Sequence, residues 1–305
     1  MKGNVCVVTG ANSGVGFETA AGMAGLGATV VLVCRSRDRG ESAVEAIRSR
    51  TASADLRLLV ADLSSFAQVR RLAKKLTVDL PSVDVLVNNA GIYRAGLELT
   101  EDGFERTMAV NHLSHFLLTH LLLPRLRDSL PGRVVNVASR AHRRGRLTLE
   151  NLEDVLRGRG RYDGWNAYSD SKLANILFSR ELARRYDAFE LSTCSMHPGV
   201  LATGLWDRNR NPLSLLMRML RPVLGKASVG GDAVVFLARQ PPEAVHGKYF
   251  DKTRPVEPRP MGRDDLLAAR FWELSAQAVG LPAEGGGPFR GEDPIFGGTR
   301  PEVSK

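Results

Sequence analysis

The sequence predicts an α/β fold: a doubly wound parallel sheet of about seven strands in a single domain, followed by an irregular C-terminal tail. Short apolar runs rich in β-branched residues alternate with helical segments along most of the 305 residues. These runs are apolar throughout, which is typical of parallel strands covered by helices on both faces. Right-handed crossovers between such strands produce the doubly wound arrangement.

The expected elements follow a regular rhythm. In the first half we expect strands at 4–9, 28–34, 56–61 and 83–87, and helices at 17–26, 38–49 and 65–76. In the second half we expect a long helix at 104–127, a strand at 133–138, a helix at 165–186, a strand at 191–196, a helix at 227–238 and a short last strand at 248–250.

Three segments interrupt this rhythm. Residues 140–161 are basic and are expected to be rich in loops, whereas residues 212–225 are apolar and lie between prolines. From about residue 283 the chain is rich in Gly and Pro, which predicts little regular structure. We therefore expect one domain at 1–282, with a lid around 200–226, and a tail at 283–305.

Composition excludes several classes of protein. Lys and Arg number 42 against 33 Asp and Glu, a formal net charge of +9. No run interleaves basic and aromatic residues as single-strand binding requires, so we expect no nucleic-acid partner. The sequence shows neither a signal peptide nor a charge-free window of about 20 residues. We expect a cytoplasmic protein, with Cys6, Cys34 and Cys194 buried as small hydrophobic residues.

A glycine-rich turn joins the first strand to the first helix. The segment TGANSGVG at 9–16 contains Gly10, Ser13, Gly14, Val15 and Gly16. In this position glycines allow a tight turn, a close approach of the backbone to a pyrophosphate and close packing of helix and strand. The amides at the helix N-terminus then face the phosphates. The turn predicts a dinucleotide site.

The end of the second strand predicts which dinucleotide binds. A site that prefers NAD places Asp or Glu there, to bind the ribose 2′-hydroxyl. This chain has Arg35 and Arg37 instead, and Asp38 follows at the expected start of the next helix. Arginine side chains can pair with a 2′-phosphate, so the sequence favours NADP(H).

With these features the chain resembles the short-chain dehydrogenase/reductase superfamily, which has a Rossmann fold. The resemblance covers about residues 4–250 and includes the glycine turn, NNAG at 88–91, YSDSK at 168–172, Pro198-Gly199 and Thr203. The segments VNHLSHFLLTHLLLPRL and MHPGV are similar to the retinol dehydrogenase branch, and light-dependent protochlorophyllide reductases share some of this pattern.

The resemblance implies a role for each matching position. Gly10, Ser13, Gly14, Val15 and Gly16 would hold the pyrophosphate; Asp62 and Leu63 would bound the adenine; Asn89, Ala90 and Gly91 would line the ribose side; Tyr168 and Lys172 would reach the nicotinamide ribose; and Pro198, Gly199, Val200 and Thr203 would face the nicotinamide.

Carbonyl reduction requires a hydride and a proton. The Tyr168 hydroxyl can supply the proton, although a tyrosine has an ordinary pKa of about 10. Lys172 lies one helical turn further on, so we expect its charge to lower the Tyr168 pKa. Ser139 can donate a hydrogen bond to the substrate oxygen. The resemblance implies that Asn111 holds a water linking Lys172 to solvent.

Other side chains admit more than one interpretation. His112, His115 and His120 lie on one expected helix without an acidic partner at ligand spacing, so we expect no metal site. His142 could border the substrate or be a solvated loop residue. Trp165 and Trp206 could form a substrate wall or belong to the core. Residues 212–225 could pack on their own domain, form a Met-rich lid over an apolar substrate, or lie on an anionic membrane as a peripheral contact.

We therefore expect an NADP(H)-dependent oxidoreductase that interconverts an apolar aldehyde or ketone and its alcohol, with retinal and retinol as the model substrates. One alternative is a non-catalytic NADP(H)-binding sensor or scaffold; the presence of both Tyr168 and Lys172 argues against it. Another is reduction of a C=C bond, as in protochlorophyllide reductases. By analogy with many relatives, a homo-oligomer is also compatible with the sequence.

Overall fold

The computed structural model of the protein describes residues 1–51, 55–199 and 226–282. The expected lid, apart from Lys226, lies outside the described residues, as do Trp206, Val200, Thr203 and the tail at 283–305.

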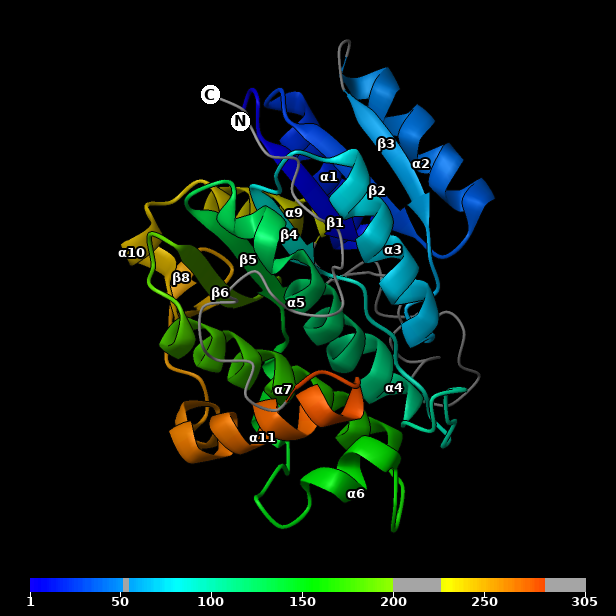
Figure 1. Ribbon diagram of the computed structural model, residues 1–305, viewed down its shortest axis with the longest axis vertical. Helices are drawn as coiled ribbons and strands as arrows, with labels where there is room; N and C mark the ends of the chain where they lie inside the picture. Colours follow the sequence, from blue (N-terminus) through cyan, green and yellow to red (C-terminus); the bar gives the residue numbers. More distant parts are fainter. Residues whose placement is uncertain (52–54, 200–225, 283–305) are drawn as a thin grey trace, which may run out of the picture.

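One sheet of eight strands forms the centre of the molecule (Figure 1), in the order β3-β2-β1-β4-β5-β6-β7-β8. The strands are β1 (Val5–Thr9), β2 (Thr29–Cys34), β3 (Leu56–Val60), β4 (Val85–Asn88), β5 (Gly132–Val137), β6 (Leu191–His197), β7 (Tyr249–Asp251) and β8 (Arg254–Pro255). Strands β1 to β7 pair in parallel, and the two-residue β8 pairs antiparallel with β7. The doubly wound parallel sheet is confirmed, with a short eighth strand added at its edge.

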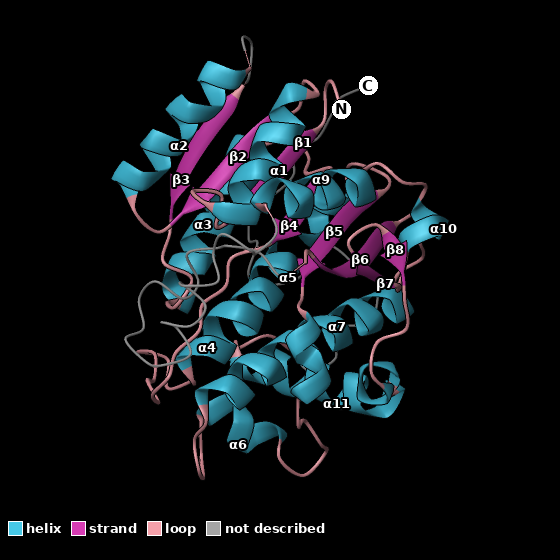
Figure 2. Cartoon of the chain, turned by 180° about the vertical axis from the view of Figure 1, so that it is seen from behind, coloured by secondary structure: helices cyan, strands magenta, loops and turns pink. Residues whose placement is uncertain are grey.

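Helices cover both faces of the sheet (Figure 2). On one face lie α1 (Gly14–Gly25), α2 (Arg37–Arg50) and α9 (Ala227–Ala238). On the other lie α3 (Phe66–Asp79), α5 (Ser114–Arg127) and α7 (Gly164–Arg185), with α11 (Asp265–Ala278) packed outside α7. Successive strand residues enter opposite cores, Val7 one and Val8 the other, which explains why β1 and β2 are almost entirely apolar on both faces.

The expected helix at 104–127 contains a local distortion. It consists of α4 (Arg106–Met108), a π-helical turn η1 (Ala109–Leu113) and α5, in unbroken succession. Such single π-turns insert an extra residue and are frequent at functional sites. Here the turn carries Asn111.

The segment at 140–161 is more regular than expected. It contains a 3-10 helix η2 (Arg140–Arg144) and the short helix α6 (Leu152–Arg157). Further along, α10 (Pro242–Val245) precedes β7, and a second 3-10 helix η5 (Pro260–Arg263) precedes α11.

Helix α11 was not expected from the sequence. Its N-cap is Asp264, whose carboxylate accepts a hydrogen bond from the Leu267 amide at 2.9 Å. Phe271 and Trp272 are among the most buried side chains of the described residues; Trp272 packs on Phe116 and Phe178, and Phe271 stacks on His112. The capping residue and the apolar spacing were the sequence signals for this helix.

The three cysteines are buried and free, in β1, β2 and β6, as expected. Among the described residues, no helix combines the length and the apolar character needed to span a membrane.

Candidate active site

The strand order reverses between β1 and β4, so the connections after these two strands diverge to opposite faces of the sheet. Thr9, the last residue of β1, fixes the two strand ends to each other. Its hydroxyl oxygen accepts from the amides of Asn89 and Ala90 at 2.9 and 3.0 Å. The Asn89 side-chain amide donates back to the Thr9 carbonyl at 2.8 Å.

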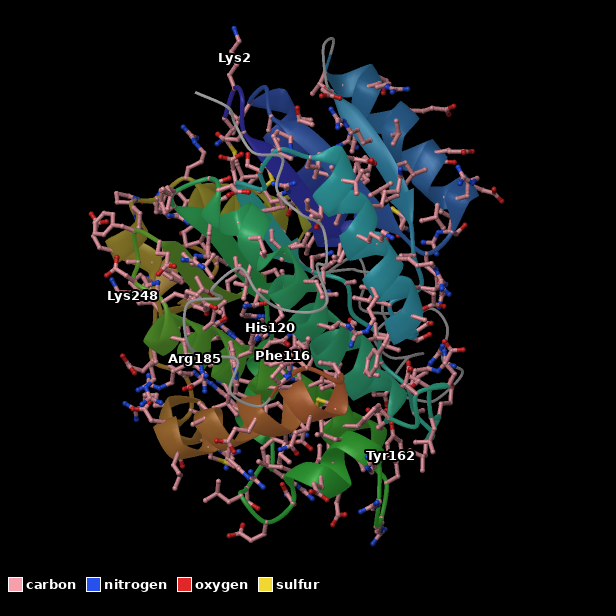
Figure 3. All side chains as sticks on the ribbon, in the orientation of Figure 1. Lys2, Phe116, His120, Tyr162, Arg185 and Lys248 are labelled. Atoms are coloured by element: carbon pink, nitrogen blue, oxygen red, sulfur yellow. The ribbon has the colours of Figure 1, made fainter. Side chains whose placement is uncertain are left out.

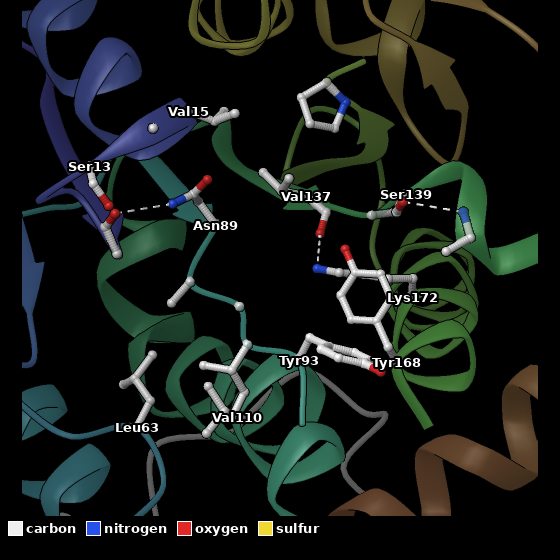
Figure 4. Close-up of a pocket in the computed structure, with 18 of the residues that line it drawn as sticks. Ser13, Val15, Leu63, Asn89, Tyr93, Val110, Val137, Ser139, Tyr168 and Lys172 are labelled. Atoms are coloured by element: carbon white, nitrogen blue, oxygen red, sulfur yellow. Dashed lines mark hydrogen bonds between the residues drawn. The ribbon is translucent and has the colours of Figure 1, made fainter. Parts of the chain in front are cut away.

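A cavity of about 900 Å³ opens at this edge of the sheet (Figure 4). Its lining includes most of the residues predicted from sequence: Gly10, Ser13, Gly14, Val15, Arg35, Asp62, Leu63, Asn89, Ala90, Gly91, Ser139, Tyr168, Lys172, Pro198 and Gly199. Gly16, Arg37 and Asn111 are not among the lining residues, and Val200 and Thr203 lie outside the described part of the chain.

The glycine turn allows the first helix to approach β4 closely. Gly10 has a φ of +67° and Gly14 a φ of +59°, values that favour glycine. A Cβ atom on Gly16 would lie 2.4 Å from Asn89 Nδ2 and 2.5 Å from the Gly10 carbonyl oxygen. Gly16 therefore acts by packing, while Gly10, Ser13 and Gly14 line the cavity at the start of α1. A helix N-terminus in this position suits an anion.

Arg39, rather than Arg37, accompanies Arg35 at the end of β2. Arg37 points away and pairs with Glu41 at 3.5 Å, with 69% of its side chain exposed. Arg39 lines the cavity, and Asn12 accepts from it at 3.1 and 3.3 Å in the amide orientation that satisfies both groups. The structure therefore brings Arg39, and not Arg37, to the cavity, because helix α2 begins at Arg37 and the two side chains leave it in different directions.

Tyr168 and Lys172 lie together on one face of α7, as the spacing predicted (Figure 4). Tyr168 is 7% exposed and Lys172 is 4% exposed. The Lys172 ammonium donates to the Val137 carbonyl at 3.0 Å and lies 5.6 Å from the centroid of the Tyr168 ring. Both side chains reach the cavity beside Ser139, which follows β5.

Burial shifts both pKa values away from the charged forms. It raises the pKa of Tyr168 to about 12, against a smaller lowering by the hydrogen bond with Ser139. It lowers the pKa of Lys172 to about 8. The expected lowering of the Tyr168 pKa is therefore not what the protein alone produces, because desolvation of the phenolate is the largest effect.

Asn111 ties two parts of the site together. Its amide oxygen accepts from the Ile92 amide at 2.7 Å, and its nitrogen donates to the Ile92 carbonyl at 3.0 Å and to Ser171 Oγ at 2.9 Å. Ser171 Oγ in turn donates to the Tyr168 carbonyl at 2.7 Å. The π-turn thus connects the segment after β4 to helix α7 between Tyr168 and Lys172.

Ser139 and His142 shape the turn after β5. Ser139 Oγ accepts from the Ala141 amide at 3.2 Å. His142 is buried, with Nδ1 2.7 Å from the Ser139 carbonyl oxygen and Nε2 accepting from the Arg259 amide at 3.3 Å. His142 is not among the residues lining the cavity, so it supports this turn from behind.

An aromatic wall stands next to Tyr168. Trp165 stacks on Tyr168 with centroids 5.7 Å apart, and Tyr93 meets both rings edge-on at 6.3 Å. Sequence reasoning had left Trp165 open and had missed Tyr93. The other lining residues that it did not single out are Asn12, Val33, Ser36, Arg39, Ala61, Ser64, Ile92, Arg94, Arg106, Val110, Val137, Ala138, Arg140, Ala141, Arg143, Arg144 and His197. Several of these follow directly after a strand, which was the available signal.

The histidines of the long helical region have separate partners. His112 Nε2 lies 2.9 Å from Ser275 Oγ, His115 Nε2 lies 2.9 Å from Thr9 Oγ1, and His120 Nδ1 lies 2.8 Å from the Phe116 carbonyl oxygen. Burial lowers the pKa of all three. His120 and Phe116 lie near α11 in the interior (Figure 3).

Known proteins are similar to this chain in sequence and in fold. Residues 4–150 match the family described as short chain dehydrogenase. Retinol dehydrogenase 12 of Homo sapiens is 39% identical over 282 residues, 92% of this chain and 88% of that protein. The crystal structure of an uncharacterized protein from Mycobacterium paratuberculosis is 35% identical with a TM-score of 0.69, over 92% of this chain and 95% of the other. The complex of Pseudomonas aeruginosa RhlG with NADP is 26% identical with a TM-score of 0.64, over 82% and 94%.

The fold and the site together define an oxidoreductase, and the chain belongs to the short-chain dehydrogenase/reductase family. Within that family it is similar to retinol dehydrogenases, as the segments at 110–126 and 196–200 predicted.

The packing at Gly16 predicts a loss of stability on substitution. Gly16→Ala would force Asn89 and the Gly10 carbonyl apart, and we expect it to lower the free energy of unfolding by roughly 1–3 kcal/mol. Urea unfolding followed by circular dichroism measures this. Gly96→Ala is the control, because a Cβ there meets nothing within 4 Å. Equal stability of the two variants would contradict the packing argument.

Proposed function

We propose that this protein interconverts a carbonyl compound and its alcohol with NADP(H), and that Tyr168 exchanges the proton. The observation that carries the proposal is the placement of Tyr168, Lys172 and Ser139 in one cavity with the glycine turn. The groups come from three parts of the fold: the glycine turn after β1, the segment after β5 with Ser139, and helix α7 with both Tyr168 and Lys172.

The residues present fit an NADP(H) molecule. The turn from Gly10 to Gly14 would hold the pyrophosphate against the N-terminus of α1, and Asp62 with Leu63 would bound the adenine. Arg35 and Arg39 would pair with the 2′-phosphate, since the end of β2 has no carboxylate in this position. RhlG, a relative by fold and sequence, was crystallised with NADP.

The protein's own side chains supply the proton that the substrate oxygen takes up during carbonyl reduction. When bound, the nicotinamide would supply or accept the hydride. The Tyr168 hydroxyl is neutral at neutral pH, since burial raises its already high pKa further, to about 12, and it donates its proton to the substrate oxygen. The Lys172 ammonium stabilises the phenolate that remains, and Ser139 donates a hydrogen bond to the same oxygen. Asn111 fixes α7 relative to the segment after β4, and so positions Tyr168 and Lys172.

The aromatic wall supports an apolar group next to the reacting carbon. Tyr93 and Trp165 present ring surface beside Tyr168, together with Ala141. Retinol, the substrate in the name of the similar human protein, offers an apolar chain of this kind. We therefore propose an aldehyde or ketone with an apolar body as the substrate, reduced to its alcohol or formed from it.

Removal of the proton donor tests the proposal. Tyr168→Phe should lower kcat for carbonyl reduction by at least about 100-fold, because the reaction loses its acid. The dissociation constant of NADPH, measured by fluorescence titration, should change little. Tyr186→Phe, a buried tyrosine of the core, is the matched control and should retain activity. Full activity of Tyr168→Phe would exclude this mechanism.

The choice of cofactor depends on charge at the end of β2. Arg35→Asp should weaken NADPH binding and shift the preference toward NADH by roughly tenfold or more, because a carboxylate repels the 2′-phosphate and binds the 2′-hydroxyl. Steady-state kcat/KM with each cofactor measures the shift. Arg37→Asp is the control, since Arg37 lies away from the cavity. A wild-type protein that used NADH equally well would contradict the assignment.

The pH dependence of kcat/KM for carbonyl reduction should follow the ionisation of Lys172. Burial lowers its pKa to about 8, so the ammonium is present below that pH and is lost above it. Because the ammonium stabilises the phenolate, kcat/KM for reduction should be level at low pH and fall as the pH rises through about 8. Lys172→Met should be slow at every pH and should lack this decline. A wild-type profile that stayed level up to pH values well above 8 would contradict this role.

A further inference from the structure

The described lining of the cavity is strongly cationic. Seven arginines and Lys172 line it, and Asp62 is the single carboxylate among the described lining residues. The arginines are Arg35, Arg39, Arg94, Arg106, Arg140, Arg143 and Arg144. Such a cavity attracts anions from solution and retains those that pair with its guanidinium groups.

The arginines belong to two groups by their place in the fold. Arg35 and Arg39 follow β2, at the part of the cavity where we propose that the 2′-phosphate binds. The other five lie in the segments after β4 and β5, which also supply Tyr93 and Ser139. The phosphates of the cofactor are accounted for by the glycine turn and the first group, so the second group requires another explanation.

Arg94 and Arg106 are the core of this second group. Both pair with a single carboxylate: Arg94 Nε lies 3.4 Å from Glu98 Oε1, and Arg106 Nε lies 3.2 Å from Glu98 Oε2. The two arginine side chains are only 19% and 28% exposed, whereas that of Glu98 is 47% exposed. Two partly desolvated cations thus share one solvated anion, which leaves positive charge facing the cavity.

Glu105, the carboxylate next to Arg106 in the chain, does not neutralise the charge of the two arginines from within the cavity. Glu105 is buried and is not a lining residue. Its oxygens accept from the amides of Thr107 and Met108 and from the Tyr162 hydroxyl, at 2.7–3.0 Å. Glu105 therefore stabilises the start of α4, and Glu98 is the carboxylate that pairs with the guanidinium groups of Arg94 and Arg106.

Two of the three arginines after β5 increase the positive potential. Arg140 is paired with Asp251. Arg143 and Arg144 are exposed, and within the described ranges neither has a carboxylate partner. They raise the local concentration of an anion near the mouth of the cavity.

We infer that the carbonyl substrate carries an anionic group, a carboxylate or a phosphate, away from its reacting carbon, and that Arg94 and Arg106 bind it. This inference rests on the proposed function and specifies its substrate class. The apolar part of the molecule would lie against Tyr93 and Trp165. Two planar guanidinium groups suit such an anion because each can donate two parallel hydrogen bonds to it.

A matched series of substrates tests the inference. Medium-chain ω-oxo carboxylic acids, the corresponding ω-oxo alkyl phosphates and the methyl esters of the acids differ in charge and share the reacting aldehyde. We expect kcat/KM of the wild-type protein to be roughly tenfold or more higher for one of the anions than for the ester. The preferred anion identifies whether a carboxylate or a phosphate is the natural group.

Variants assign the preference to residues. Arg94→Met with Arg106→Met should abolish the preference for the anion and leave kcat/KM for the ester within about twofold. Glu98→Gln should increase the preference, because it removes the competing carboxylate. Arg270→Met, an exposed arginine paired with Glu273 on α11, is the control for a simple loss of positive charge.

Binding measurements separate the failure of the inference from that of the proposed function. Turnover of ester and anions at equal kcat/KM would overturn the inference and leave the proposed function standing. If no carbonyl is reduced, the proposed function fails.

In that case calorimetric titration with a saturated fatty acid, its methyl ester and an alkyl phosphate tests the inference. Anion binding that is lost in the double arginine variant supports the inference. Equal binding of the ester and the anions overturns it. A double variant that instead weakens NADPH binding would assign these arginines to the cofactor and overturn it too.

Discussion

Between β1 and β4 the chain changes the direction in which it adds strands to the sheet, and every other feature of the site depends on this reversal. The connections that leave the two strands diverge, so their carboxyl ends border an open crevice. Thr9 holds the crevice at a fixed width through its bonds to Asn89 and Ala90. Gly16 permits this width, because a larger residue would collide with Asn89.

Burial is the second constraint, and it acts on the chemistry. Tyr168 and Lys172 are placed on the inner face of α7, where desolvation favours the neutral forms of both. A neutral tyrosine is the form that donates a proton. Lys172, with its pKa lowered to about 8, is charged below that pH, and its ammonium donates to the Val137 carbonyl. The same low polarity strengthens the attraction between the cavity's arginines and an anion.

These constraints meet in a cavity whose two ends differ in chemistry. Near Tyr168 the surface is aromatic, while guanidinium groups surround it from the segments after β4 and β5. An apolar carbonyl compound with an anionic group satisfies both surfaces at once. The similarity to retinol dehydrogenases agrees with the aromatic part, and the arginines distinguish this chain's proposed substrate from an uncharged retinoid.

Local patterns were sufficient for most of the sheet and for the glycine turn, because buried parallel strands and a phosphate-binding turn impose residue types at each position. They were insufficient where direction in space matters. Arg37 and Arg39 look equivalent in sequence, yet the start of α2 turns one toward Glu41 and the other toward the cavity. The π-turn at Asn111 was hidden because the bonds of the Asn111 side chain reach Ile92 and Ser171, which lie far from it in the chain. Helix α11, in contrast, is indicated locally by its N-cap Asp264 and by the apolar residues after it.

The sequence by itself determined the parallel sheet, the dinucleotide turn and the pairing of Tyr168 with Lys172, because each depends on neighbours within a few residues or on a repeated apolar pattern. Only the tertiary structure decided the direction of the Tyr168 pKa shift, the choice of Arg39 over Arg37 and the gathering of five further arginines around the cavity. Desolvation and the sum of charges around a cavity arise from segments far apart in the chain, and no local pattern of residues contains them.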